Sequence, residues 1–500
     1  MAESVLRSWN GEAVTVGDVP DVPVERFQGV VCDVVAVGGR AVALFGQPAS
    51  PGRTRVTAVL AHDAESRIGL LSTEVGESWP SVSAECPSLQ AFERELWEEY
   101  GVEPEGHPWP KPLRFAPPRA GEDRRRGEIP GAYPFFQVEG EEVHEVAVGP
   151  VHAGIIEPGH FRFQCHGEHV FHLEIVLGYQ HRGVERLLEG WPSPRALAVA
   201  ESIAGDTAVG HGLAFCRLLE SLAGAEPPPR ASVLRGVALE LERLANHVGD
   251  LGMLAGDVGF LPTASYCGAL RAEFLNATAE ICGNRFGRAL VVPGGVRFDL
   301  TAGEADRLAA KVARAFERVR EAVELFFVSP SSRNRTDGTG VVSRETCDLL
   351  GLVGPAARAC GAERDVRRDH PFEIYRFAHL PIATADTGDV FARALVRFLE
   401  AERSAHFVVN QLRALPDGPV RRELPPLAPG RMVVSMVEGW RGEIAHVGVT
   451  DGAGRLCRVK VKDPSFHNWM GLAMALRGEE ISDFPLCNKS FNLSYAGHDL

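Results

Sequence analysis

The chain has 500 residues, of which 45% are hydrophobic and 24% charged, and its formal net charge is −14 at pH 7. This length predicts two or three domains, and the composition is that of a globular protein and not of a disordered chain. The acidic balance argues against non-specific nucleic-acid binding and against electrostatic attachment to an anionic membrane.

The sequence shows neither a membrane span nor a cysteine framework for a metal. No apolar run reaches the roughly 20 residues that cross a bilayer. The start, Met-Ala-Glu-Ser, lacks the basic and apolar regions of a signal peptide, so a cytoplasmic chain is expected. The ten cysteines are scattered without a C-x-x-C pair and are interpreted as reduced core residues.

Residues 1–116 are predicted to form a small α/β domain. Strands are expected at residues 55–61 and 68–72, and an amphipathic helix at residues 88–100, with Ser88 as its N-cap and Gly101 at its end. The stretch that follows, residues 117–131, is rich in proline, glycine and arginine, and it is predicted to be a linker.

Residues 132–500 are predicted to form a large, mainly helical domain with small sheets at its edge, so the fold class is α+β. A β-hairpin is expected from residues 161–165 and 170–177, with Gly167 in its turn. Long helical patterns follow at residues 194–222, 235–254, 265–286, 302–327 and 390–412. A second hairpin (432–437 and 444–449), a strand at 460–462 and an irregular tail from residue 483 complete the prediction.

Several motifs stand in the order found in one known family. Phe92-Glu-Arg-Glu-Leu-Trp-Glu-Glu-Tyr-Gly-Val resembles the 30-kDa-type subunit of complex I. Later motifs resemble the large subunit of energy-converting [NiFe]-hydrogenases and the 49-kDa-type subunit of complex I: Gly149-Pro-Val-His, Gly178-Tyr-Gln-His-Arg-Gly-Val-Glu, Glu240-Leu-Glu-Arg-Leu-Ala-Asn-His, Pro293-Gly-Gly-Val-Arg, Asp365-Val-Arg-Arg-Asp-His-Pro and Glu438-Gly-Trp-Arg-Gly-Glu. The fused order resembles formate-hydrogenlyase-type hydrogenases. The resemblance implies a small α/β domain followed by a hydrogenase-like helical domain with peripheral β-hairpins.

The nickel–iron centre of that family is held by two C-x-x-C pairs, and both pairs are missing here. The resemblance places Ala204, Thr207, Ser494 and Gly497 at the four ligand positions. Alanine and glycine have no ligand atom, and neutral hydroxyls bind soft metals poorly. The chain is therefore expected to hold no metal and not to act as a [NiFe]-hydrogenase by itself.

The cysteine-free subunit of complex I offers a tyrosine and a histidine to a quinone, and this chain matches that pattern only loosely. Ile203 stands at about the position of the expected tyrosine, and His152 fits the histidine loosely. Thr207 and Tyr495 stay open as alternative hydroxyl donors. Quinone is thus a candidate ligand, and iron–sulfur clusters are expected in partner subunits, with no cofactor bound by this chain.

Polar side chains in segments that face the former metal site are the candidate site residues. Such buried ionisable groups need partners and often have shifted pKa values. The tail is expected to fold back beside residues 201–211 and to leave a polar cavity that relays protons or binds a quinone head group. The candidates are His152, Glu157, His211, Arg367 and Asp369, with Glu185 in a similar segment. The alternative is a satisfied structural network without a ligand.

The resemblance implies a subunit of a complex I-like (NADH–quinone) or hydrogenase-related oxidoreductase complex. Its expected partners are an iron–sulfur small subunit, a ferredoxin-like subunit and membrane subunits, and no nucleic acid. Through these partners the chain would lie peripherally on the inner face of the cell membrane. A non-catalytic scaffold subunit of the same kind of complex is the alternative, and the sequence leaves both open.

Overall fold

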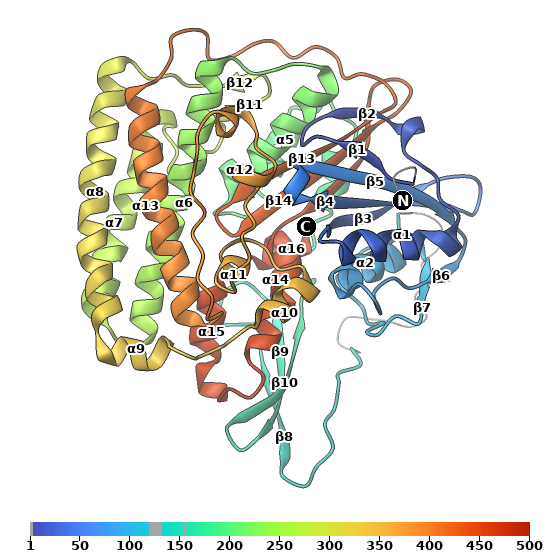
Figure 1. Ribbon diagram of the computed structural model, residues 1–500, viewed down its shortest axis with the longest axis horizontal. Coiled ribbons are helices and arrows are strands. Elements are labelled where there is room, and N and C mark those ends of the chain that lie inside the picture. Colours follow the sequence, from blue (N-terminus) through green and yellow to red (C-terminus); the bar gives the residue numbers. More distant parts are fainter. Residues whose placement is uncertain (1–3, 120–132, 155) are drawn as a thin grey trace.

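The computed structural model describes residues 4–119, 133–154 and 156–500, and it joins a small sheet domain to a long helical bundle through a central sheet (Figure 1). Most of the predicted linker, residues 120–131, lies outside the described residues. The predicted α+β class is confirmed. One continuous apolar core runs from Phe27 in the small domain to Leu244 in the bundle, so the two parts are packed as one body.

The small domain is built on an antiparallel sheet with the strand order β1-β5-β4-β3. Its strands are β1 (Leu6–Ser8), β3 (Arg40–Pro48), β4 (Thr54–His62) and β5 (Arg67–Val75). Helices α1 (Val24–Ala36) and α2 (Gln90–Tyr100) pack against it, and β6 (Ser78–Pro80) pairs in parallel with β7 (Glu103–Glu105). Gly101 ends α2 in the left-handed conformation, as predicted.

The predicted N-cap of α2 is wrong. Ser88 lies inside a 3₁₀ turn, Pro87–Leu89, and α2 begins at Gln90 without a side-chain cap. The proline fixes the backbone of that turn one residue before Ser88. The hydroxyl of Ser88 instead contacts the Cys86 thiol at 3.3 Å.

The central sheet has the order β15-β14-β13-β2 and takes strands from both ends of the chain. Strands β13 (Arg431–Gly439), β14 (Gly442–Thr450) and β15 (Leu456–Lys462) form the predicted hairpin and strand, and β2 (Ala13–Thr15) pairs with β13. A strand from residues 1–116 therefore completes a sheet of the larger predicted domain. Helix α5 (Ala208–Ala223) packs on this sheet.

A three-stranded ribbon projects from the body (Figure 1). Strands β9 (His160–His166) and β10 (His169–Val176) form the predicted hairpin, and Gly167 adopts a positive φ in its turn. β8 (Val143–Val148) adds a strand that the sequence analysis did not predict. Its sequence, Val-His-Glu-Val-Ala-Val, does not alternate apolar and polar residues, so it gave no period-2 signal.

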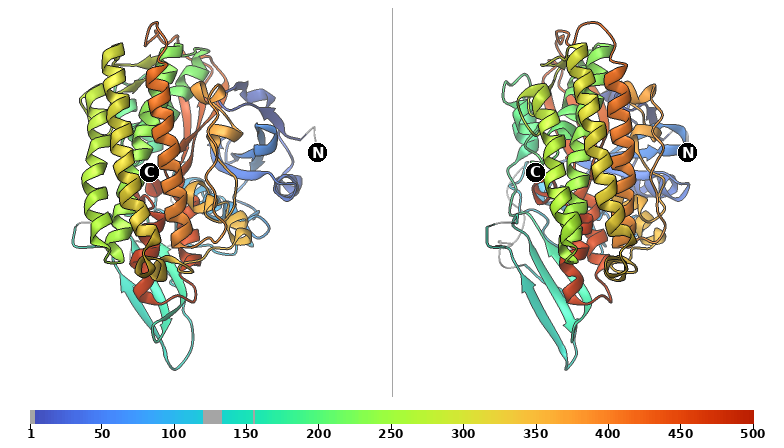
Figure 2. Two further views of the ribbon diagram at one scale, coloured as in Figure 1. Left: turned by 60° about the vertical axis from the view of Figure 1, so that its left-hand side comes forward. Right: turned by 90° about the vertical axis from the view of Figure 1, so that its left-hand side faces the viewer.

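Helices α6 (Pro229–Asp257), α7 (Leu261–Cys282), α8 (Ala302–Val328) and α13 (Val390–Arg413) run side by side as the bundle (Figure 2). Thr301 and Glu304 form a capping box at the start of α8. Within the described ranges, no helix combines the length and apolarity needed to cross a membrane. Short elements complete the body: α3 (Val184–Leu188), α4 (Ala196–Ala200), α9 (Pro330–Thr336), α10 (Arg344–Leu350), α11 (Gly354–Arg358), α12 (Val366–Asp369), α14 (Ser465–Ala475), β11 (Val291–Val292) and β12 (Gly295–Val296).

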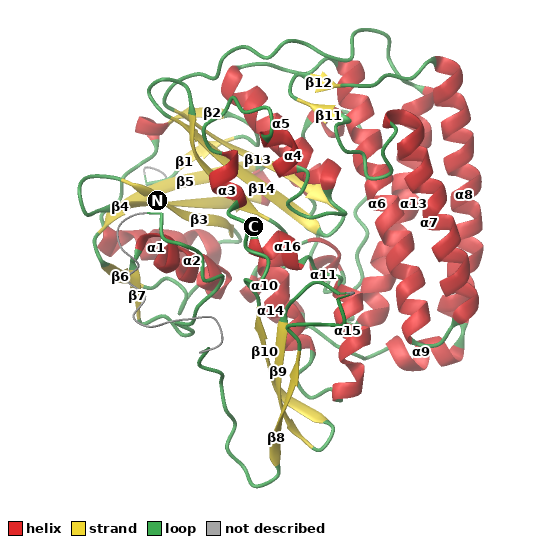
Figure 3. Ribbon diagram, turned by 180° about the vertical axis from the view of Figure 1, so that it is seen from behind, coloured by secondary structure: helices red, strands yellow, loops and turns green. Residues whose placement is uncertain are grey.

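Two predictions about the second domain are wrong, and both concern the site. The pattern at 194–222 is not one helix, because a turn at 201–207 separates α4 from α5; Gly205 is a poor helix former, and Asp206 is bound by Arg441 from another element. The tail is not irregular, since it forms α15 (Phe484–Phe491) and α16 (Tyr495–Asp499). Helices this short carry little periodicity. Figure 3 shows α16 and the C-terminus at the centre of the molecule.

Buried ion pairs fasten the small domain to the central sheet. On α2, the Glu95 carboxylate accepts a hydrogen bond from Arg114 and is bound by the Lys460 ammonium on β15 at 2.6 Å from both oxygens. We expect Glu95→Gln to lower the free energy of unfolding by about 2 kcal/mol, because two buried cations lose a charged partner. Urea denaturation measures this, with the exposed Glu103→Gln as control. Equal stability of the two variants would show that the ion pairs of Glu95 do not stabilise the contact between the small domain and the central sheet.

Candidate functional site

The four positions predicted to correspond to the family's metal ligands lie in two segments. Ala204 and Thr207 belong to the turn before α5, and Ser494 and Gly497 open α16. All four are buried. The Ser494 hydroxyl accepts the Gly497 N–H at 2.9 Å and so caps α16.

Arg441, at the tip of the β13–β14 hairpin, ties the two segments together. Its guanidinium donates to both carboxylate oxygens of Asp206, at 2.6 and 2.8 Å, and to the Asn492 carbonyl at 2.5 Å. Burial alone would raise the pKa of Asp206, but the charge and hydrogen bonds of Arg441 bring it below its ordinary value. Trp440 Nε1 donates to the Thr207 hydroxyl at 3.1 Å. Arg441 therefore links the tail, through the Asn492 carbonyl, to the turn before α5, through its bidentate ion pair with Asp206.

A second buried chain of hydrogen bonds starts at Asp463. Its Oδ2 lies 3.0 Å from His211 Nε2, and His211 Nδ1 lies 3.1 Å from His446 Nε2. A Cβ atom built on Gly497 would stand 2.6 Å from Asp463 Cγ. The Asp463 carboxylate thus fills the space that a cysteine at position 497 would need, where the sequence analysis expected an open polar cavity.

The loop at 149–160 brings Glu157 to the outer edge of this site. Glu157 is exposed overall, but its carboxyl group is partly desolvated, which raises its pKa. The negative charge of Asp206 raises this pKa further. The positive charge of Arg441 and a hydrogen bond from the Tyr495 N–H lower it. His152 Nε2 donates to the Gly159 carbonyl at 2.9 Å and so braces the same loop. The structure thus brings Glu157 and His211 close to the four predicted ligand positions, with His152 beside Glu157.

Arg367, Asp369 and Glu185 lie in other ion-pair networks. Arg367 binds Asp365 at 2.6 Å and Glu240 at 3.1 Å. Asp369 accepts from Arg368 and from the Asp365 N–H. Glu185 binds the Lys460 ammonium at 3.0 Å and the Arg458 guanidinium at 2.7 Å. The structure pairs these groups within α12 and along β15, and not with Thr207 or Ser494.

Glu242 is a site residue that the sequence analysis missed. On α6, its carboxylate accepts the N–H groups of Val209 at 2.7 Å and Gly210 at 3.1 Å, at the start of α5. Burial raises the pKa of Glu242 to about 8, against the effect of these hydrogen bonds. Asn246, four residues later on the same helix face, donates to the Asp206 carbonyl at 2.9 Å. That i, i+4 polar pair within Glu240-Leu-Glu-Arg-Leu-Ala-Asn was the signal available.

The donor set at the vacated positions does not suit a soft metal. Ala204 and Gly497 have no ligand atom, and the hydroxyls of Thr207 and Ser494 are hard donors already held in hydrogen bonds. Across the part of the chain that the structure describes, no three His, Cys, Asp or Glu side chains converge in a way that would hold a metal ion.

Comparison with known families matches both halves of the chain. The model for the respiratory-chain NADH dehydrogenase 30 Kd subunit matches residues 27–120, and the model for its 49 Kd subunit matches residues 257–432 and 425–499. These matches follow the order predicted from the motifs.

Individual relatives cover most of the chain. A carbon monoxide-induced hydrogenase of Rhodospirillum rubrum is 33% identical over 70% of this chain and 97% of its own length. Formate hydrogenlyase subunit 5 of Escherichia coli is 29% identical over 84% of this chain and 77% of its own length. The NADH-quinone oxidoreductase subunit 4 of Thermus thermophilus is 30% identical over 68% of this chain and 90% of its own length.

Proposed function

Because the chain belongs to the family of complex I 49-kDa-type and hydrogenase large subunits, with a 30-kDa-type domain fused in front, we propose that it is an oxidoreductase subunit that moves protons at its former metal site without a nickel–iron centre. The observation that carries this proposal is the placement of Asp463. Its carboxylate occupies the space of the fourth ligand and pairs with His211 at 3.0 Å. A carboxylate and an imidazole in contact are suited to proton transfer.

Two carboxyl groups near this pair, one at the surface and one buried, are candidate proton carriers. Glu157 stands at the edge, and burial raises its pKa above its ordinary value. Glu242 is buried behind the turn before α5, and its pKa is raised to about 8. A carboxyl group with a pKa of about 8, as in Glu242, binds and releases a proton near the pH of a cell. The Asp206–Arg441 pair stands between them and fixes the turn.

The loop that carries Glu157 supports docking of a partner at the same place. Val151 is 79% exposed and Ile156 is 51% exposed, and they flank His152. Exposed apolar side chains beside a polar site are typical of interfaces between subunits. We therefore assign this face to an iron–sulfur small subunit, with ferredoxin-like and membrane subunits completing the complex on the inner face of the cell membrane. Quinone is the candidate electron acceptor.

The test is quinone-dependent turnover of the complex purified through a tag on this chain. We expect Glu157→Gln to lower turnover by about 100-fold, since general acid–base groups contribute at least that much. His152→Gln should lower it less, because His152 only braces the loop. The exposed Glu141→Gln is the matched control. Full turnover in both site variants would favour the alternative, a non-catalytic scaffold subunit.

A further inference from the structure

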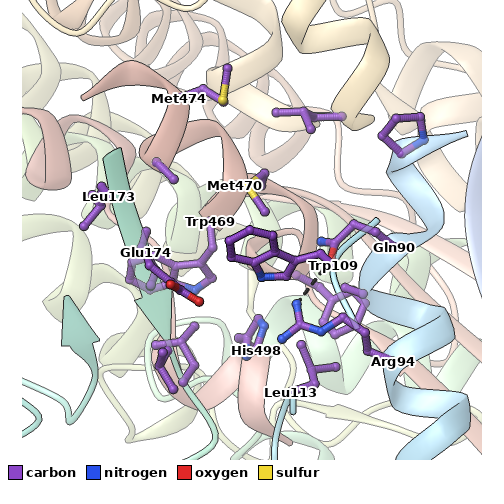
Figure 4. A pocket seen from close by; sticks show the side chains of 18 of the residues that line it. Gln90, Arg94, Trp109, Leu113, Leu173, Glu174, Trp469, Met470, Met474 and His498 are labelled. Atoms are coloured by element: carbon purple, nitrogen blue, oxygen red, sulfur yellow. Dashed lines mark hydrogen bonds between the residues drawn. The ribbon is translucent and has the colours of Figure 1, made fainter. Parts of the chain in front are cut away.

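A second site lies between the small domain and the rest of the molecule, next to α14. A cavity of about 270 Å³ opens between α2, the segment 108–113, β10 and α14 (Figure 4). Both family halves of the chain contribute to its wall. Trp469 lines this cavity, and its indole Nε1 donates to the Ser494 carbonyl at 3.4 Å. This residue therefore stands between the cavity and the candidate functional site.

The wall of the cavity is apolar and aromatic. Leu113, Leu173 and Trp469 are buried, and Figure 4 shows them with Trp109, Met470 and Met474 around the space. Methionine side chains adapt to the shape of a bound molecule, and aromatic rings favour flat partners. A dry cavity of roughly 150 Å³ accepts benzene. The volume of 270 Å³ therefore has room for two fused rings.

The wall has three charged side chains, those of Glu174, Arg94 and Arg477. Glu174 accepts from the Lys111 ammonium at 2.7 Å and from the Phe136 N–H at 2.8 Å. Arg94 donates to the carbonyls of Lys111 at 2.7 Å and Pro112 at 2.6 Å. Glu174 is therefore neutralised by Lys111, whereas Arg94 is held by neutral carbonyls and Arg477 is exposed, so the wall tolerates a ligand oxygen with partial negative charge.

One polar atom of the wall has no partner. Within the described residues, the buried Nε2 of His172 makes no hydrogen bond. The His172 ring lies 6.0 Å from the Trp109 ring and 4.9 Å from the Phe136 ring, centroid to centroid. Buried polar atoms are normally satisfied by protein, water or ligand. The ligand that fits offers this imidazole one hydroxyl or carbonyl.

We propose that this cavity binds a flat molecule of one or two fused aromatic rings that carries one hydrogen-bonding oxygen. The oxygen meets His172 Nε2, and the rings lie among Trp109, Trp469 and the two methionines. This proposal does not depend on the proposed proton transfer at the other site.

The experiment titrates the complex that contains this chain with 2-naphthol and with naphthalene in a calorimeter. The native protein should bind both, and 2-naphthol more tightly. His172→Phe keeps the aromatic shape, so it should weaken 2-naphthol by about fivefold, the value of one hydrogen bond, and leave naphthalene unchanged. The exposed His169→Phe on the same strand is the control.

Filling the cavity gives a second test. Ala473→Phe on α14 should weaken both probes more than tenfold, whereas Ala302→Phe on the exposed start of α8 should not. If Ala473→Phe lowers the melting temperature, Ala91→Leu fills the opposite wall with a smaller change. Binding of 2-naphthol that survives both fillers, or no heat of binding up to its solubility limit, would overturn the proposal.

Discussion

Replacing Gly497 by cysteine is expected to lower the free energy of unfolding by about 3 kcal/mol, because overpacking a buried site and leaving a buried polar group without its hydrogen bond each cost about 1–3 kcal/mol. The added Cβ would stand 2.6 Å from Asp463 Cγ, so the carboxylate must move away and leave His211 without its partner at 3.0 Å. Chemical denaturation measures the loss. Gly205→Cys is the matched control, because a Cβ there meets no atom within 4 Å.

The same crowding predicts that four restored cysteines do not rebuild a nickel site. A variant with Ala204→Cys, Thr207→Cys, Ser494→Cys and Gly497→Cys should contain no stoichiometric nickel by elemental analysis, as should the native chain. Asp463→Ala removes the obstacle. The double variant Asp463→Ala/Gly497→Cys should therefore lose less unfolding free energy than the sum of the losses of the two single variants. Additive costs, or one nickel per chain in either protein, would contradict the interpretation that Asp463 fills the site.

The long elements could be predicted from sequence because their periodicity is strong. The patterns at 302–327 and 390–412 correspond to α8 and α13 almost residue for residue, since a helix of that length repeats its apolar face several times. The break at 201–207 could not be predicted in this way. It depends on Arg441, more than 230 residues away along the chain, which binds Asp206 and holds the turn open.

The same long-range dependence limited the prediction of the site. The sequence indicated His211 and Glu157, because they lie in segments that, by the family resemblance, face the metal pocket. It gave no reason to select Asp463, which follows a strand with no motif around it and meets His211 only in the folded chain. Arg367 was chosen from its motif, yet the partners that decide its role, Asp365 and Glu240, bind it in another network.

We expect the free energy of unfolding to fall as the pH rises, because of the buried carboxyl group of Glu242. Its folded pKa of about 8 lies above the value of about 4.3 expected in the unfolded chain. Between these values the folded state binds more protons than the unfolded state, so the carboxyl group destabilises the fold progressively from about pH 5 to pH 8. Below that window the group is protonated in both states and contributes no pH dependence.

Glu242→Gln should remove this part of the pH dependence. The glutamine carbonyl can still accept the N–H groups of Val209 and Gly210, and it carries no charge into the buried site. We expect the difference in unfolding free energy between pH 5.5 and pH 8.5 to shrink by on the order of 3 kcal/mol relative to the native chain. Urea denaturation at the two pH values measures this, with the exposed Glu321→Gln on α8 as control. An unchanged difference would show that Glu242 ionises at its ordinary pKa, and it would then hold no proton for transfer at neutral pH.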